Sequence, residues 1–203
     1  MADAAEKYSC PIVGGDITSW NQPLMTVGTA LLARPAGVRP IRRNGAKPGD
    51  LLFVTGELGG SALGRHLSFT PRINEARQLS AVATIHAMID LSDGLSTDLG
   101  HICRESGVGA EIQSDTIPIS DAAKKMAAAD GAAELVHALN DGEDFELLLA
   151  VEPVDAQDLL KQNPLGDVRL TCIGRIVEGS GIVQIAADGS KSPLKPGGYE
   201  HFR

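Results

Sequence analysis

Residues 89–99 read Ile89-Asp90-Leu91-Ser92-Asp93-Gly94-Leu95-Ser96-Thr97-Asp98-Leu99. The apolar residues 87–89 at their start predict the end of a short buried strand. After the turn, the apolar spacing is that of one face of a helix, which Ser106-Gly107 would end; this face consists of Leu95, Leu99, Ile102 and Cys103. A strand followed directly by a helix indicates a protein that mixes α and β structure.

The turn between this strand and this helix carries two carboxylates, a hydroxyl and a glycine. A helix N-terminus offers backbone N–H groups and the positive end of the helix dipole. Carboxylates at such a place hold a hard cation such as Mg²⁺, which is often shared with substrate phosphates. One hypothesis is therefore a metal-bridged phosphate site at Asp90, Ser92 and Asp93. The other is that Ser92 or Asp93 only caps the helix, and the stretch alone supports both equally.

Composition and charge exclude several classes of function. The net charge is −8, and no basic run is longer than Arg42-Arg43, which argues against nucleic-acid and membrane binding. The three cysteines are far apart in the sequence and are predicted to be buried in a reducing compartment: Cys10, Cys103 and Cys172. Neither a signal peptide nor an apolar run of membrane-spanning length is present, so we expect a cytoplasmic protein.

The first fifth of the chain reads as the end of one domain. A short strand is predicted at residues 11–13, before Gly14-Gly15-Asp16, and another at residues 24–32. Gly-Gly-Asp alone is more often a plain turn than a ligand site. Residues 34–50 are rich in Pro, Gly and Arg, which predicts a connection. We therefore expect one domain to end at residue 33 and a second to cover residues 34–203.

The apolar residues 51–54 predict a central strand, which runs into the glycine-rich residues 55–61. That loop is typical either of a phosphate cradle or of close helix–sheet packing. Two arginines are candidates for phosphate contacts. Arg72 would lie in the first turn of a helix, where the dipole disfavours a cation without an anion, and Arg43 is either a clamp or a solvated surface residue.

Thr70-Pro71 predicts the start of that helix, with an inward face of Ile73, Ala76, Leu79, Val82 and Ala83. Further strands are predicted at residues 109–113, 147–151, 170–177 and 182–186, and further helices at 120–129, 132–139 and 155–161. Residues 140–146 form an acidic turn before a buried strand. Its carboxylates repel one another unless a cation or a donor-rich ligand lies among them, or unless the turn is simply exposed.

The order of these motifs resembles one family. The motifs that carry the resemblance are Gly14-Gly15-Asp16, Arg43 before Gly45–Asp50, Val54–Gly56, Phe69–Arg72, Asp90–Gly94, Asp141–Glu146 and Gly198–Phe202. Together they resemble the thiamine-monophosphate kinases, which belong to the PurM-like, or AIR-synthase-related, superfamily. The resemblance implies an α/β (α+β) fold, with a mixed sheet and packed helices in a PurM-like C-terminal domain. Residues 1–33 would be the end of an N-terminal ATP-binding domain.

The resemblance also implies a reaction and its residues. The reaction is Mg²⁺-dependent transfer of the ATP γ-phosphoryl group to thiamine monophosphate, which gives thiamine diphosphate. The matching metal ligands are Asp16, Asp90 and Asp93, and the matching ATP contacts are Gly15, Asp16, Arg43 and Ser92. The matching substrate contacts are Glu143 and Tyr199. No covalent protein nucleophile is implied, since phosphoryl transfer depends on alignment and charge neutralisation.

One departure from the family affects the prediction for this chain. Members of the family carry a longer N-terminal region with further metal- and nucleotide-binding carboxylates. We therefore expect a truncated kinase, completed by homodimerisation or by an N-terminal half. Two alternatives remain: a substrate-binding or assembly module that needs another chain for nucleotide, and a different PurM-like ATP-dependent enzyme.

Overall fold

A computed structural model describes residues 1–16, 21, 25, 27–34 and 39–199, and it divides the chain into two units, Met1–Val38 and Arg39–Arg203. The division falls inside the predicted connection at residues 34–50. The assignment of the first unit to the end of an ATP-binding domain stays a prediction.

The first unit contains helix α1, Ala2–Lys7, and no strand among its described residues. The prediction of a strand at residues 11–13 is wrong, and the described part of residues 24–32 is not a strand either. A strand needs a neighbour to pair with its backbone groups. Here the apolar side chains remain in solvent instead, with Val13 88 % and Leu32 96 % exposed.

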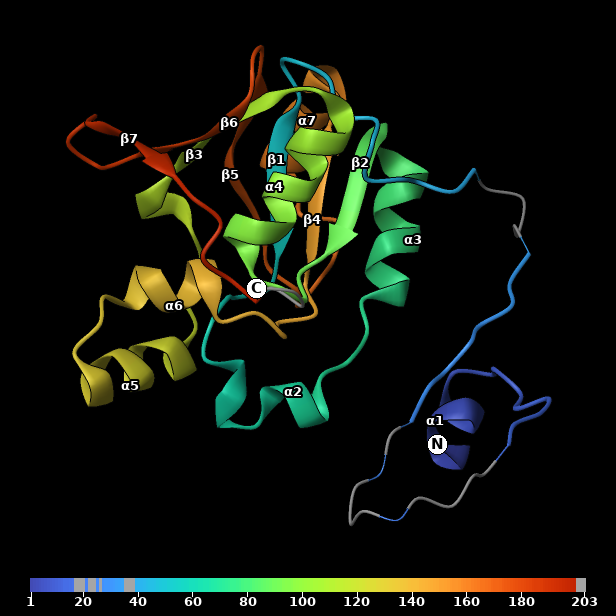
Figure 1. Ribbon diagram of the computed structural model, residues 1–203. Coiled ribbons are helices and arrows are strands. Elements are labelled where there is room, and N and C mark those ends of the chain that lie inside the picture. The colour runs from blue at the N-terminus through green and yellow to red at the C-terminus, as the bar shows by residue number, and fades with distance from the viewer. Residues whose placement is uncertain (17–20, 22–24, 26, 35–38, 200–203) are drawn as a thin grey trace. The chain divides into compact units, whose positions relative to one another are not determined.

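The second unit is built on a seven-stranded sheet with the order β2-β4-β1-β5-β3-β6-β7 (Figure 1). Its strands are β1 Leu51–Thr55, β2 Ile85–Asp90, β3 Gly109–Gln113, β4 Leu147–Val151, β5 Leu170–Val177, β6 Gly181–Ile185 and β7 Lys191–Leu194. Neighbouring strands are antiparallel except β3 and β6, which are parallel. The predicted mixed sheet with packed helices is confirmed, and β1 lies inside the sheet as its apolar sequence predicts.

Helix α4 Leu95–Ser106 packs on one face of the sheet, and α3 Ile73–Val82 and α7 Pro153–Lys161 pack on the other. The remaining helices lie beyond one end of the sheet (Figure 1): α2 Arg65–Ser68, α5 Asp121–Asp130 and α6 Glu134–Asn140. Two short 3₁₀ turns are η1 Ser61–Leu63 and η2 Ser114–Thr116. Successive residues of a strand point to opposite faces. Accordingly Leu52 packs in the cluster that contains α4, and Phe53 packs in the cluster that contains residues of α3 and α7.

Helix α4 follows the sequence pattern closely. Leu95, Leu99 and Ile102 are fully buried, and the helix ends at Gly107 in the left-handed conformation, with φ 68°. Glycine adopts this conformation without the steric cost of a Cβ atom. The predicted start and end of this helix are both confirmed.

Other expectations are corrected, and one strand was not foreseen. Helix α3 begins at Ile73 rather than at Thr70-Pro71, and of its predicted inward face only Leu79 is fully buried, because Ile73 and Val82 are 42 % and 57 % exposed. Of the three cysteines predicted to be buried, only Cys103 is; Cys10 is exposed and Cys172 is half-buried. Strand β7 was not predicted, since Lys191-Ser-Pro-Leu194 has no strand pattern and forms only by pairing with β6.

Within the described part of the chain, none of the helices has both the length and the apolar character needed to cross a membrane.

Replacing Leu52 by alanine tests the importance of the central strand. Leu52 is fully buried, so Leu52→Ala should lower the free energy of unfolding by about 2–5 kcal/mol through lost burial and a cavity. The matched control is Leu160→Ala on α7, where the side chain is 52 % exposed and the loss should stay below about 1 kcal/mol. Urea unfolding measures both; equal losses would contradict the burial of Leu52 in the core.

Candidate active site

The turn between β2 and α4 has a geometry that side-chain capping does not explain. Asp90 is the last residue of β2, and Gly94, with φ 100°, occupies the N-cap position of α4 without a side-chain cap. The hypothesis that Ser92 or Asp93 caps the helix is therefore wrong. A carboxylate does bind the backbone of this turn: Asp98 Oδ2 accepts the N–H of Asp93 at 3.0 Å.

Asp98 is a candidate ligand that the sequence analysis missed. It is 1 % exposed, and burial, together with the charges of Asp93 and Asp90, raises its pKa to about 7. Ligand atoms of Asp93, Asp98 and His101 all lie within 4.8 Å of one another. The carboxylates fit a hard cation such as Mg²⁺, whereas the imidazole suits Zn²⁺ or another transition metal better. The sequence did offer a sign of this role for Asp98: it is an acidic residue in the first turn of an amphipathic helix.

The acidic residues 140–146 find their hydrogen-bond donors in the glycine-rich residues 55–61. Asp144 accepts the N–H of Gly59 at 2.9 and 3.0 Å and the hydroxyl of Ser61 at 2.7 Å. Asp141 accepts the N–H of Gly60 at 2.8 Å. The glycine-rich loop therefore cradles carboxylates of the same chain, and this explains why the acidic groups tolerate one another.

Glu146 completes this contact at the start of β4. Its buried carboxylate accepts hydrogen bonds from Thr55 Oγ1 at 2.6 Å and from Arg65. Arg72 binds it with two parallel bonds, Nε and Nη2 each at 2.7 Å. The anion that Arg72 requires is therefore a protein carboxylate, and this hydrogen bond raises the pKa of the Arg72 guanidinium.

The acidic loop in turn holds the turn after β2. The N–H of Glu143 donates to the carbonyl of Ser92 at 2.8 Å, and the N–H of Phe145 donates to the carbonyl of Leu91 at 2.8 Å. These bonds place Glu143, a predicted substrate contact, beside Ser92, a predicted ATP contact.

The chain near its C-terminal end also contacts this turn. The N–H of Tyr199 donates to the carbonyl of Asp93 at 3.1 Å, and the N–H of Gly198 donates to Thr97 Oγ1 at 3.2 Å. A Cβ atom at Gly198 would collide with the Asp93 carbonyl, and one at Gly142 would come within 2.7 Å of the Ser92 carbonyl. Glycine at both positions lets three segments that are distant in sequence meet at one point.

The structure thus unites some of the predicted site residues and not others. Asp90, Ser92, Asp93, Glu143 and Tyr199 belong to the three joined segments. Gly15 and Asp16 belong to the other unit, so their relation to this site is not defined. The predicted motif residues 200–202 lie outside the described residues.

Arg43 forms an ion pair with Glu105, with Nε and Oε1 2.7 Å apart, and its side chain is 49 % exposed. It still acts on the site electrostatically. Burial lowers the pKa of His101 first, and the charges of Arg104 and Arg43 lower it further. Arg43 is therefore an exposed cation within electrostatic reach of the Asp93–Asp98–His101 group.

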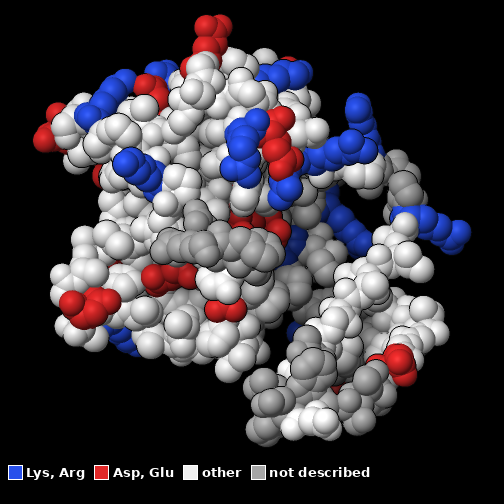
Figure 2. Space-filling model, viewed as in Figure 1, with Lys and Arg blue, Asp and Glu red and all other residues white. Residues whose placement is uncertain are grey.

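Charged side chains of both signs lie on the face of the molecule that carries α4. Figure 2 shows Lys and Arg side chains around the C-terminal part of α4 with acidic side chains among them, and several acidic side chains lower down, toward its N-terminal end and over α5 and α6.

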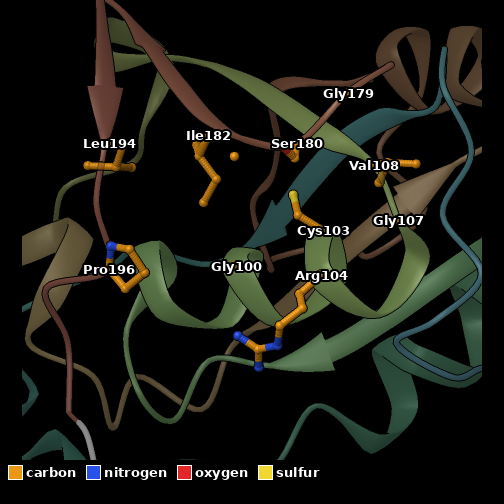
Figure 3. A pocket seen from close by; sticks show the side chains of 11 residues that line it. Gly100, Cys103, Arg104, Gly107, Val108, Gly179, Ser180, Ile182, Leu194 and Pro196 are labelled. Carbon is orange, nitrogen blue, oxygen red and sulfur yellow. The ribbon is translucent and has the colours of Figure 1, made fainter.

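An open groove of about 450 Å³ lies between α4 and the strands β6 and β7 (Figure 3). Its walls include Ile182, Leu194 and Cys103, and Arg104 is the only ionised side chain among its lining residues. Burial raises the pKa of the Cys103 thiol to about 11, so the thiol stays protonated at neutral pH. These walls do not suit a polyphosphate.

Comparison with protein families and known structures gives a consistent result. The model of the family described as AIR synthase related protein, C-terminal domain, matches residues 47–186. The chain is 40 % identical over 201 residues to the thiamine-monophosphate kinase of Rhodopirellula baltica, covering 99 % of this chain and 62 % of that protein. It therefore spans less than two thirds of the length of this relative.

Two solved structures are similar to this chain in both fold and sequence. The thiamine-monophosphate kinase from Stenotrophomonas maltophilia K279a has a TM-score of 0.62 and 32 % identity, covering 75 % of this chain and 54 % of that chain. The structure described as AaThiL complexed with AMPPCP and TMP has a TM-score of 0.64 and 33 % identity, covering 80 % and 54 %. The family resemblance expected from the motifs is confirmed.

Gly198→Ala tests the contact between the C-terminal segment and the turn. An added Cβ must displace the Asp93 carbonyl or the segment itself, so we expect about 1–3 kcal/mol less stability in urea unfolding. Gly100→Ala in α4 is the matched control, because its Cβ would meet nothing closer than Pro196 Cγ at 3.8 Å. That change should be neutral or stabilise by up to about 1 kcal/mol. Equal stability of both variants would mean that the segment is not held at this turn.

Asp144→Asn tests the buried carboxylate in the glycine-rich loop. Burial raises the pKa of Asp144 to about 6, so the folded state binds its proton more tightly than the unfolded state does. Stability contributed by this proton is present at low pH and is lost as pH rises from about 4 to about 6. The unfolding free energy of Asp144→Asn relative to the parent should therefore rise by up to about 3 kcal/mol across this range. A difference that does not change with pH would refute the raised pKa.

Proposed function

Since the chain belongs to the AIR synthase related protein family, whose C-terminal domain it carries, we propose that it acts in the thiamine-monophosphate kinase reaction. The reaction transfers the γ-phosphoryl group of ATP to the phosphate of thiamine monophosphate and gives thiamine diphosphate. The observation that carries the proposal is the meeting of three segments at the turn after β2, which joins Asp93, Glu143 and Tyr199.

The relatives support this choice of substrates. Several curated relatives are named thiamine-monophosphate kinase, and one similar structure is described as complexed with AMPPCP, an ATP analogue, and TMP. We propose ATP as co-substrate and thiamine monophosphate as acceptor on this basis.

Each site residue has a role in the proposal. Asp90 and Asp93, with Asp16 of the first unit, would ligate Mg²⁺, and the buried Asp98 would hold the backbone of Asp93 in place. Bound Mg²⁺ would supply charge neutralisation for the phosphates.

The remaining residues would bind the two substrates. Ser92, Gly15 and Asp16 are proposed to contact ATP, and the exposed guanidinium of Arg43 is proposed to contact its phosphates. Glu143 and Tyr199 are proposed to contact thiamine monophosphate. A phosphate contact by Arg72 would have to be shared with Glu146 and Glu75, which it already binds.

Because the chain spans 62 % of its relative's length, the complete reaction is proposed for an assembled form, either a homodimer or a complex with an N-terminal half. We place this form in the cytoplasm. The second candidate function is a binding module that keeps the substrate contacts and needs another chain for nucleotide. The coverage of 62 % of the relative's length favours it for the isolated chain.

A coupled assay of the purified chain distinguishes these functions. It follows thiamine diphosphate formation from ATP, Mg²⁺ and thiamine monophosphate, and calorimetry measures thiamine monophosphate binding in parallel. Turnover would support the kinase, and binding without turnover would support the module. If neither is found, the proposed function is wrong and only the family assignment remains.

Asp90→Asn should abolish Mg²⁺-dependent nucleotide binding, because an amide is a far weaker ligand for a hard cation than a carboxylate. Titration with AMPPCP, with and without Mg²⁺, measures the effect. Asp158→Asn on α7 is the matched control, since it removes the same charge from an exposed helix position. Unchanged nucleotide binding by Asp90→Asn, with a lower melting temperature, would show that the turn is structural only.

A further inference from the structure

Phe69 and Phe145 form an aromatic pair, and neither is among the proposed site residues. Phe145 is part of the acidic loop, and Phe69 packs against it. The ring centroids are 4.0 Å apart and the planes differ by 23°, so the rings are stacked. Phe69 lies in the extended link between α2 and α3, and Phe145 lies in the acidic loop two residues after Glu143. The pair therefore connects the segment that carries Arg72 with the loop that carries the substrate contact.

The backbone of the acidic loop is strained at Glu143 and Phe145. Glu143 and Phe145 have φ values of 53° and 51°, in the left-handed region that side chains other than glycine rarely adopt. The surrounding contacts fix this backbone. The N–H groups of both residues donate to carbonyls of the turn after β2, and Glu146 is held by Arg65 and Arg72. A strained but fully fixed loop is typical of a ligand site.

The stack leaves one ring accessible. Stacking uses one face of each ring, and Phe69 remains 36 % exposed although it packs on Phe145. A large apolar ring that served only to pack the loop would be more stable when buried. The exposed carboxylate of Glu143 lies on the same loop. Phe69 is far from Glu143 in the sequence, but its stack on Phe145 attaches its ring to the loop that carries Glu143. An aromatic face and a carboxylate are the two groups that attract a delocalised organic cation.

We propose that Phe69, supported by its stack on Phe145, binds the cationic ring of the acceptor and thereby helps determine its specificity. This inference rests on the proposed function, since the thiazolium ring of thiamine monophosphate carries a positive charge. The aromatic face attracts the ring, Glu143 neutralises its charge, and the phosphate is left to point toward the turn at Asp93. Phe69 would contact the substrate without taking part in a bond-making step.

The test compares Phe69→Leu with Phe69→Tyr by calorimetry. Leucine keeps apolar packing and removes the aromatic face, so we expect thiamine monophosphate to bind roughly fivefold to thirtyfold more weakly. Thiamine, which has the ring but no phosphate, should be weakened by the same factor. Phe69→Tyr keeps the ring and should bind both within about twofold of the parent. Binding of AMPPCP with Mg²⁺ should not change in either variant.

Leu67→Ala is the matched control, because Leu67 is an apolar residue of the neighbouring helix α2 that is 82 % exposed. It should bind thiamine monophosphate like the parent. If Phe69→Leu also binds like the parent, the stack only packs the loop and the inference is overturned while the proposed function stands. If the parent chain binds no thiamine monophosphate, the proposed function and the inference fail together.

Discussion

The site depends on the contact between the acidic residues 140–146 and the glycine-rich residues 55–61. Three carboxylates, Asp141, Asp144 and Glu146, are drawn toward one loop that offers backbone N–H groups and hydroxyls, with two arginines beside it. An unpaired buried carboxylate would be costly, so each of these donors is needed. Glycine is required on the donor side, since a Cβ at Gly59 would come within 2.7 Å of the backbone of α6.

This contact also fixes the backbone of the turn after β2. Once Glu146 and Asp144 are fixed, the N–H groups of Glu143 and Phe145 are directed at the carbonyls of Ser92 and Leu91. The segment that contains Gly198 and Tyr199 also binds this turn. A phosphoryl-transfer site requires aligned groups more than reactive ones, and three fixed backbone segments supply such alignment.

Local patterns predicted most of the second unit because its elements are set by neighbouring residues. The apolar spacing of α4 and its end at Gly107 could be read directly, as could the apolar strand β1. Elements that exist only through a partner were missed or misplaced. Strand β7 forms by pairing with β6, and the apolar residues 11–13 form no strand where no partner is described.

By itself, the sequence determined the mixed α/β class, the family and the residue types of the site, because these follow from short-range periodicity and motif order. Only the tertiary structure decided what those residues contact. In it, Arg72 donates to Glu146, the glycine-rich loop donates to Asp144, and Asp93 donates its N–H to Asp98. These pairs are separated by 74, 85 and 5 positions. Donor and acceptor inventories do not specify their partners, and only the packed backbone brings a particular pair within hydrogen-bond distance.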